Sequence, residues 1–315
     1  MVQRYREMAD DPLRLRAFRD AIAKAVKRGA RVADLGCGLG TYGVFACRAG
    51  AARVWAVDEG PIAEVAREIA AANGVGDRMR VLRGRSTEIE VPERVDLVVY
   101  EDYVAGLLSS AQLLVLRDVR ARWLAPRGRL LPARARISSA PFESRELRAS
   151  LDRFGEGGER VLGVDLGPAR RRAFGAPHHL QLRPAALLCE PVTAAPFALL
   201  DAALDRLGAR GARRIARDGV VYGLATWFAL ELPPRWLGTG PLDPPSAWRQ
   251  LCLPFDPPLP VREGETLRWA LDAGALGDQV VWRWRASTAR ARAEGHSLDA
   301  VPLPRAATAP KKIRR

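Results

Sequence analysis

Up to Pro132 the chain alternates between short apolar runs and longer segments in which an apolar residue recurs every three or four positions. The short runs predict strands at 31–35, 53–57, 79–82, 95–100 and 128–131. The longer segments predict helices at 12–28, 42–49, 61–73 and 110–123. Strands that alternate with helices in this way form a parallel sheet with right-handed crossovers. We therefore expect an α/β domain over residues 1–132.

Beyond Pro132 the pattern changes to alternating apolar and polar positions between turns rich in glycine and proline. This alternation predicts antiparallel strands at 135–140, 219–232, 248–253, 266–271 and 280–285. We expect a β-barrel or sandwich over residues 133–304, interrupted by a partly helical insertion at 145–188. Residues 305–315 form a short basic tail.

Composition narrows the possible classes of protein. A chain of 315 residues with 48% hydrophobic side chains is long enough for two packed domains. We find no apolar run of about 18 residues, and the first residues are charged, so we expect a cytoplasmic protein without a membrane span. The four cysteines lack the spacing of metal ligands, and with only three histidines no metal site is expected.

The net charge of +14 allows an acidic or nucleic-acid partner. Arginine far outnumbers lysine, and the arginines are spread along the chain, as expected of a GC-rich genome. The charge pattern therefore favours an ordinary solvated surface, and a nucleic-acid partner is not expected.

A glycine-rich run, Asp34-Leu-Gly-Cys-Gly-Leu-Gly40, follows the first predicted strand. Ligands of α/β sheets bind at this edge, and glycines let the backbone approach them closely. The spacing G-x-G-x-G differs from the G-x-G-x-x-G of dinucleotide-binding loops. Asp58 ends the second strand, where its carboxylate can accept hydrogen bonds from both hydroxyls of a ribose. The alternative is that Asp58 only caps the next helix.

These motifs resemble those of the protein arginine methyltransferase family over nearly the whole chain. The resemblance is closest in VADLGCGLGTYGVFACRAGAARVWAVD at 32–58, and it continues in Met8–Phe18, Ile62–Asn73, Leu130–Pro132, Val221–Glu231 and Ser246–Gln250. It implies a Rossmann-like class I methyltransferase domain followed by a β-barrel with an inserted dimerisation arm at 145–188, and hence a homodimer. We expect apolar residues of this arm to be exposed for a partner, namely Leu147, Leu151, Phe154 and Leu162.

The resemblance also implies S-adenosyl-L-methionine as cofactor, with S-adenosyl-L-homocysteine as product. Arg14 corresponds to the family's arginine that holds the methionine carboxylate, and Met8 to a methionine at the reacting centre. At the family's adenine-binding glutamate this chain has Thr87, and Ser86 or Thr87 can replace its hydrogen bond. The expected cofactor contacts are Arg14, Asp34, Gly36, Gly38, Gly40, Asp58, Glu59, Ser86, Thr87 and Glu101.

The acceptor site departs from the family pattern. The family holds the guanidinium between two glutamates of one hairpin; here the first is Glu101, but the second position carries Ser110. The intervening Trp-Met-Gly has become Asp102-Tyr103-Val104, and a histidine of the barrel has become Ala247, next to Trp248. We expect Glu101 and Asp102 to be the catalytic residues. The remaining walls of the substrate pocket are expected to be Met8, Tyr103, Ser110 and Trp248. The alternative for Tyr103 and Trp248 is that they are aromatic residues of the core.

Loss of one carboxylate from a buried guanidinium clamp typically costs about 3–5 kcal/mol. The sequence therefore favours a methyltransferase whose acceptor is not a standard protein arginine, such as a peptide or a natural-product intermediate. One alternative is a true protein arginine methyltransferase in which Asp102 replaces the lost glutamate. Another is an inactive, dimeric scaffold that binds the cofactor.

Overall fold

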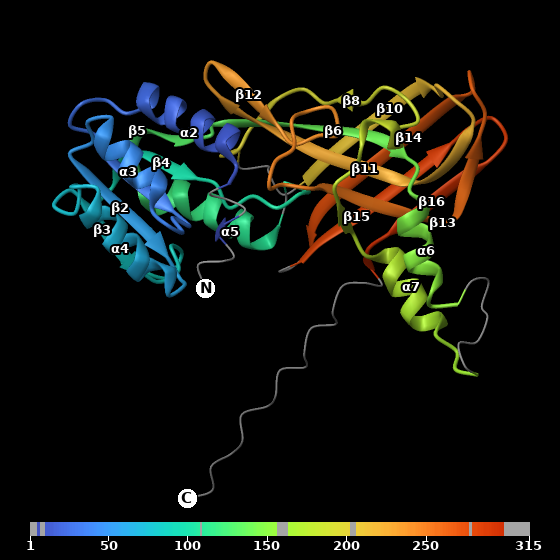
Figure 1. Cartoon of the computed structure of the whole chain (residues 1–315), viewed down its shortest axis with the longest axis horizontal. Helices are drawn as coiled ribbons and strands as arrows, with labels where there is room; N and C mark the ends of the chain where they lie inside the picture. Colours follow the sequence, from blue (N-terminus) through green and yellow to red (C-terminus); the bar gives the residue numbers. More distant parts are fainter. Residues whose placement is uncertain are drawn as a thin grey trace, which may run out of the picture.

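The computed structural model describes residues 5–6, 10–107, 109–155, 163–201, 206–276 and 279–298. It consists of an α/β domain and a domain of antiparallel strands, with a helical projection that extends from the second domain (Figure 1). Met8, Leu162 and the basic tail lie outside the described residues. In the described part of the chain, no helix is long and apolar enough to cross a membrane, and no cluster of side chains has the make-up of a metal site.

The first domain is built on a five-stranded parallel sheet with the strand order β3-β2-β1-β4-β5. Its elements are α2 (Pro12–Ala25), β1 (Arg31–Leu35), α3 (Thr41–Arg48), β2 (Arg53–Asp58), α4 (Ile62–Ala72), β3 (Met79–Arg83), β4 (Val95–Tyr100), α5 (Ser110–Asp118), η2 (Val119–Trp123) and β5 (Leu124–Leu131). The expected α/β domain is confirmed, and β1 and β4 have the predicted bounds. Since all strands are parallel, the glycine run and Asp58 meet at one edge of the sheet.

The helix predicted at 110–123 does not continue as one α-helix. It changes after Asp118 into the π-helical turn η2. The carboxylate of Asp118 accepts a hydrogen bond from the indole nitrogen of Trp123 at 3.1 Å and ion-pairs with Arg122. These bonds link Asp118 to the side chains of the wider turn.

The second domain contains two antiparallel sheets. The larger has the order β7-β13-β11-β6-β8, with β12 paired to β11 and β9 to β6, and the smaller has the order β10-β14-β15-β16. Their strands are β6 (Arg134–Phe142), β7 (His178–Leu180), β8 (Val192–Thr193), β9 (Phe197–Ala198), β10 (Arg206–Arg214), β11 (Gly219–Leu232), β12 (Arg235–Gly238), β13 (Gln250–Val261), β14 (Thr266–Leu276), β15 (Gln279–Ser287) and β16 (Arg292–His296).

Buried tryptophans of the smaller sheet join the two sheets. The indole of Trp269 donates to Ser139 Oγ at 2.9 Å, and the indole of Trp284 donates to the carbonyl of Pro254 at 2.9 Å. Each tryptophan thus buries a large apolar ring and still satisfies its polar nitrogen. The sequence analysis missed β10, whose arginines and glycines are unfavourable in a strand, and it placed Trp248 inside a strand that begins only at Gln250.

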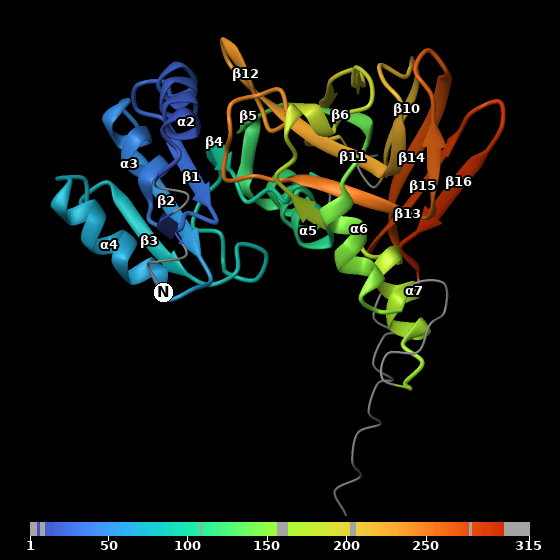
Figure 2. The same ribbon diagram turned by 45° about the vertical axis from the view of Figure 1, so that its right-hand side comes forward.

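The insertion has a helical part that projects away from both sheets (Figure 2), whereas its strand β7 pairs with β13 of the larger sheet. It contains α6 (Arg145–Asp152), α7 (Gly167–Gly175) and η4 (Pro184–Ala186). The expectation that Leu147 and Leu151 are exposed is wrong: they are only 7% and 3% exposed, because they belong to an apolar cluster that joins Phe174 of the projection to barrel residues such as Phe142 and Trp227. Phe154 is exposed, at 37%.

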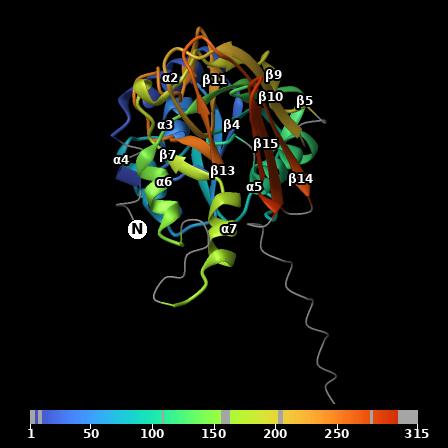
Figure 3. The same ribbon diagram turned by 90° about the vertical axis from the view of Figure 1, so that its right-hand side faces the viewer.

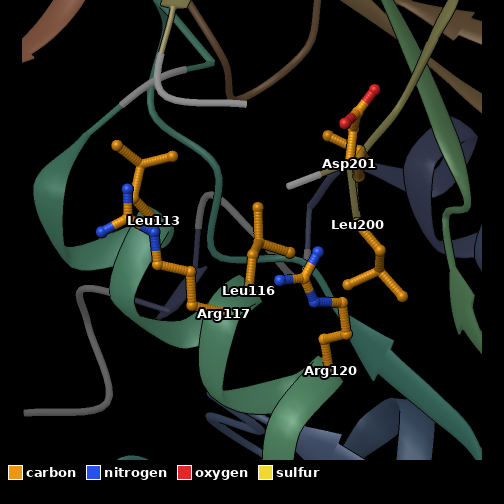
Figure 4. Close-up of a pocket in the computed structure, with 7 residues that line it drawn as sticks. Leu113, Leu116, Arg117, Arg120, Leu200 and Asp201 are labelled. Atoms are coloured by element: carbon orange, nitrogen blue, oxygen red, sulfur yellow. The ribbon is translucent and has the colours of Figure 1, made fainter. Parts of the chain in front are cut away.

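A small hollow lies where the two domains meet (Figure 4). Leu113, Leu116 and Arg120 of the α5–η2 region line one side of it, and Leu200 and Asp201 line the other. It does not involve the glycine run, so it is separate from the candidate site.

Candidate functional site

The glycine run turns the chain sharply between β1 and α3. The backbone nitrogens of Gly36 and Cys37 both donate to the carbonyl of Val57 at 2.9 Å, which fixes the start of the turn against β2. Gly40 has φ +73°, and a Cβ there would lie 2.6 Å from the Met79 side chain. Only glycine therefore fits this position.

Asp34 holds the end of the turn from inside the domain. Its carboxylate accepts a hydrogen bond from the backbone nitrogen of Gly43 at 2.8 Å. Burial raises the pKa of Asp34 to about 7, against the opposing effect of that hydrogen bond. Asp34 is only 1% exposed, so it stabilises the loop from the protein interior and does not lie on the solvent-facing side of the loop.

Asp58 connects the glycine loop to the next turn. Its Oδ2 accepts from the backbone nitrogen of Gly38 at 2.9 Å, and its Oδ1 accepts from that of Gly60 at 2.8 Å. It does not cap α4, whose N-cap is Pro61 without any side-chain hydrogen bond. A carboxylate has about four acceptor positions, so the two bonds leave room for hydroxyl donors from a ligand.

The residues expected near the adenine lie on the neighbouring turn after β3. Arg85 Nε is 2.7 Å from a carboxylate oxygen of the exposed Glu59, which ties this turn to the end of β2. Ser86 is held by its carbonyl, which accepts from Arg122 at 2.7 Å, and the partly exposed Thr87 follows it. The structure therefore brings Asp58, Glu59, Ser86 and Thr87 to one edge of the sheet.

A buried ion pair lies beside the loop. Arg14, in the first turn of α2, is 3.0 Å from Oε1 of Glu101, which directly follows β4. The hydroxyl of Tyr42 donates to Oε2 of Glu101 at 3.4 Å. The Arg14 guanidinium also lies over the ring of Trp248, 5.5 Å from its centroid. Glu101 is 8% exposed.

Burial dominates the electrostatics of Glu101. It raises the pKa of this carboxyl to about 7, even though the Arg14 charge and hydrogen bond favour the ionised form. The charge of Asp102 raises the pKa further. Near neutral pH the carboxyl therefore exists in both protonation states.

Asp102 and Tyr103 point to different surroundings. Asp102 is exposed and lies next to the glycine loop, since a Cβ on Gly36 would be 3.5 Å from Asp102 Cβ. Tyr103 is buried, and its hydroxyl makes no hydrogen bond within the described part of the chain. Trp248 packs beside it and donates its indole hydrogen to the Tyr103 carbonyl at 3.0 Å. Tyr103 and Trp248 are thus core contacts between the two domains.

Ser110 is the first residue of α5 and is partly exposed. The helix is capped by its neighbour Ser109, whose hydroxyl accepts from the backbone nitrogen of Gln112 at 3.2 Å. The Gln112 amide in turn donates to the Asp102 carbonyl at 2.8 Å. These bonds order the segment that carries the serine at the position of the family's second glutamate.

Three residues that the sequence analysis missed also contribute. Tyr42 lies at the start of α3, and its hydroxyl reaches Glu101 after β4. Tyr5 lies against the loop, because a Cβ on Gly38 would be 2.9 Å from its ring. Asp11 caps α2 and also accepts from the backbone nitrogen of Ala247 at 3.2 Å. Asp11 before Pro12 was a readable signal of a helix start.

Comparison with known proteins agrees with this geometry. Residues 18–116 match the family model described as ribosomal protein L11 methyltransferase (PrmA). A relative from Streptomyces achromogenes subsp. streptozoticus, named arginine N(omega)-methyltransferase, is 33% identical over 267 residues, which are 82% of this chain and 73% of the relative. The chain belongs to the protein arginine methyltransferase family. It is a class I methyltransferase, and its cofactor is S-adenosylmethionine.

Other members of the family match over similar lengths. Protein arginine N-methyltransferase 6 of Xenopus laevis is 28% identical over 272 residues, which are 82% of this chain and 80% of the Xenopus protein. Among solved structures, a Trypanosoma brucei PRMT1 enzyme–prozyme heterotetrameric complex with AdoHcy superposes with a TM-score of 0.81 at 23% identity. That match covers 94% of this chain and 98% of the other, and it confirms the expected fold of a methyltransferase domain followed by a barrel.

The raised pKa values of Asp34 and Glu101 predict a pH-dependent stability. Both are about 7, above the ordinary values of 3.8 and 4.5, so the folded protein binds these protons more tightly than the unfolded chain. Their contribution to stability is therefore complete at low pH and is lost as the pH rises through about 7. Denaturation between pH 5.5 and 8 should give a smaller decrease of unfolding free energy for Glu101→Gln and Asp34→Asn than for the unmodified protein. The exposed Asp77→Asn is the control, and equal slopes for all four proteins would contradict the prediction.

Proposed function

We propose that this protein transfers the methyl group to the guanidino group of a small arginine-type molecule rather than to arginine side chains of proteins. The observation that carries the proposal is the acceptor side of the site, which has one buried carboxylate, Glu101, and Ser110 and Ala247 at two family positions. The Streptomyces relative, which is named an arginine N(omega)-methyltransferase, supports the guanidino group as acceptor.

For the cofactor, we propose that the glycine loop and the residues at the strand ends bind different parts of the molecule. The glycine loop allows close approach of the backbone, and the free lone pairs of Asp58 accept the ribose hydroxyls. Arg14 balances the buried charge of Glu101 and faces the methionine carboxylate. When bound, S-adenosylmethionine would supply an activated methyl group on a sulfonium for one SN2 transfer to nitrogen, with S-adenosylhomocysteine as the leaving group and one proton lost from the nitrogen.

For the acceptor, we propose that the ionised Glu101 binds and orients the guanidinium. Bonds to Arg14 and Tyr42 fix the direction of the carboxylate, so little order has to be gained when the acceptor binds. A protein arginine would be bound by only one of the two carboxylates that the family provides, that of Glu101. A small arginine-type molecule carries further charged groups close to its guanidinium, and these can form contacts that replace the missing glutamate.

A protein arginine methyltransferase with a rearranged clamp is a second candidate, favoured by the position of Asp102. Its exposed carboxylate is next to Glu101 in the chain and close enough to influence its pKa. In this case Asp102 would supply the second carboxylate, and Asp102→Asn would abolish methylation of protein arginines.

We expect Asp58→Ala to weaken binding of S-adenosylhomocysteine by about 1–3 kcal/mol, or roughly fivefold to 150-fold, because charged hydrogen bonds are lost. Isothermal titration calorimetry measures the effect. The control is Asp77→Ala, an exposed carboxylate before β3, at the opposite edge of the sheet. Unchanged binding by the Asp58 variant would refute its role, and binding of NAD in place of S-adenosylhomocysteine would refute the whole cofactor site.

A radiolabelled-methyl assay tests the acceptor. We expect the unmodified protein to methylate L-arginine or a short arginine derivative, and to be slower on an Arg-Gly-rich protein by about a thousandfold, which corresponds to ~4 kcal/mol. Glu101→Gln should still bind S-adenosylhomocysteine but lose most activity, since a neutral amide does not pair with the guanidinium. The double variant Ser110→Glu with Ala247→His should increase activity on the protein substrate. Rapid methylation of the protein substrate by the unmodified enzyme would favour the rearranged clamp.

We also propose that the protein is a homodimer in which the helical projection of one copy binds the other. The projection extends from the barrel and exposes Phe154 and Val164. Sedimentation velocity should show a particle of twice the 34.4 kDa chain mass. The variant Phe154→Asp with Val164→Asp should sediment as a monomer, whereas Leu276→Asp, an exposed leucine of β14, should not change the mass. A monomeric unmodified protein at tens of micromolar would refute the proposal.

A further inference from the structure

The outer face of the smaller sheet gathers arginines that are far apart in the sequence. The inner face of this sheet carries Trp269, Trp282 and Trp284, and every second residue of each strand points the other way, to solvent. The strand register brings the outward residues side by side: Arg268 pairs with Ser287, and Ser287 with Arg292. Seven outward positions are arginine: Arg206, Arg210, Arg214, Arg268, Arg283, Arg285 and Arg292. We call these seven residues the arginine face.

The charges of this face are largely uncompensated. Arg210 is 3.5 Å from Asp272, and this is the one ion pair that the seven arginines form within the described residues. The outward acidic residues of the same strands are Asp272 and Glu294. All seven arginines are exposed, so the face is a broad positive surface rather than a network of ion pairs.

The dimensions of the face suit an extended polyanion. Arg206 and Arg214 lie eight residues apart on β10, which is about 27 Å, and the four strands span about 14 Å. Arg283 and Arg285 are about 7 Å apart on β15. Arginine binds phosphate with two parallel hydrogen bonds, which a lysine cannot do, and all the cations of this face are arginines.

We propose that the arginine face binds the phosphate backbone of double-stranded nucleic acid without reading its sequence. Single strands are bound by aromatic rings on which bases stack, and the outward positions of the four strands carry no Phe, Tyr or Trp, only the imidazole of His296. Double helices present closely spaced phosphates on a stiff surface, and seven arginines can contact several of them at once.

The arginine face points away from the methyl-transfer site: the inner face of its sheet reaches the loop after Glu101, where Trp282 lies against Gly106, and the arginines are on the opposite face. The sheet of β10, β14, β15 and β16 is at the end of the barrel away from β1–β4 (Figures 1 and 3). Binding there leaves the edge of the parallel sheet accessible. The inference is therefore independent of the proposed acceptor, and its failure would leave the proposed function intact.

Fluorescence anisotropy with a labelled 20-base-pair duplex tests the inference, in DNA and RNA form. The full-length protein should bind either duplex, with an affinity that falls steeply as the salt concentration rises. The triple variant Arg268→Glu, Arg283→Glu, Arg285→Glu should bind at least tenfold more weakly. The slope of log affinity against log salt should become shallower by about three, one for each lost phosphate contact.

A matched variant distinguishes the effect of the arginine face on binding from the effect of the protein's net charge. Arg28→Glu, Arg53→Glu, Arg80→Glu changes the net charge equally, at exposed positions of the α/β domain, and should retain most of the affinity. Both variants should bind S-adenosylhomocysteine like the unmodified protein, and a triple Arg→Gln variant of the face replaces the Glu variant if that one is unfolded. The inference is overturned if the duplexes do not bind, if both triple variants weaken binding equally, or if an oligo-dT strand or phosphatidylserine vesicles bind more tightly than the duplexes.

Discussion

The ion pair between Arg14 and Glu101 joins the three parts of the molecule that meet at the site. Arg14 comes from the helix before the sheet, Glu101 from the end of strand β4, and Trp248, over which Arg14 lies, from the barrel. Two buried charges are stable only when each compensates the other, and loss of one partner typically costs about 3–5 kcal/mol. The position of the barrel relative to the cofactor loop is therefore linked to the charge of one carboxylate.

Asp11 strengthens this link through backbone groups. One of its carboxylate oxygens caps the helix that carries Arg14, and the other accepts from Ala247, the residue before Trp248. The helix and the barrel loop are thus held by one side chain, so Arg14 and Trp248 keep a fixed relation. The backbone nitrogen of Ala247 makes this contact, at the position where the resemblance places a histidine.

Much of the fold and part of the site could be predicted from the sequence, because both depend on local signals. Strands such as 31–35 and 95–100 are short apolar runs, and the glycine spacing together with Asp58 indicates the cofactor. Other features depend on contacts between distant residues. Nothing local shows that Tyr42 bonds to Glu101, or that Leu147 packs against Phe174 instead of facing solvent. The arginines of the smaller sheet look scattered in the sequence, and only the pairing of the strands brings them together.

The double hydrogen bond of Asp58 has a consequence for how tightly a ligand is held. Because one carboxylate fixes the nitrogens of Gly38 and Gly60, both turns already have their shape before a nucleoside binds. Ordering one residue of a loop costs roughly 1–2 kcal/mol of conformational entropy. Here that entropy is lost when the chain folds, and more of the energy of contact is therefore available as affinity.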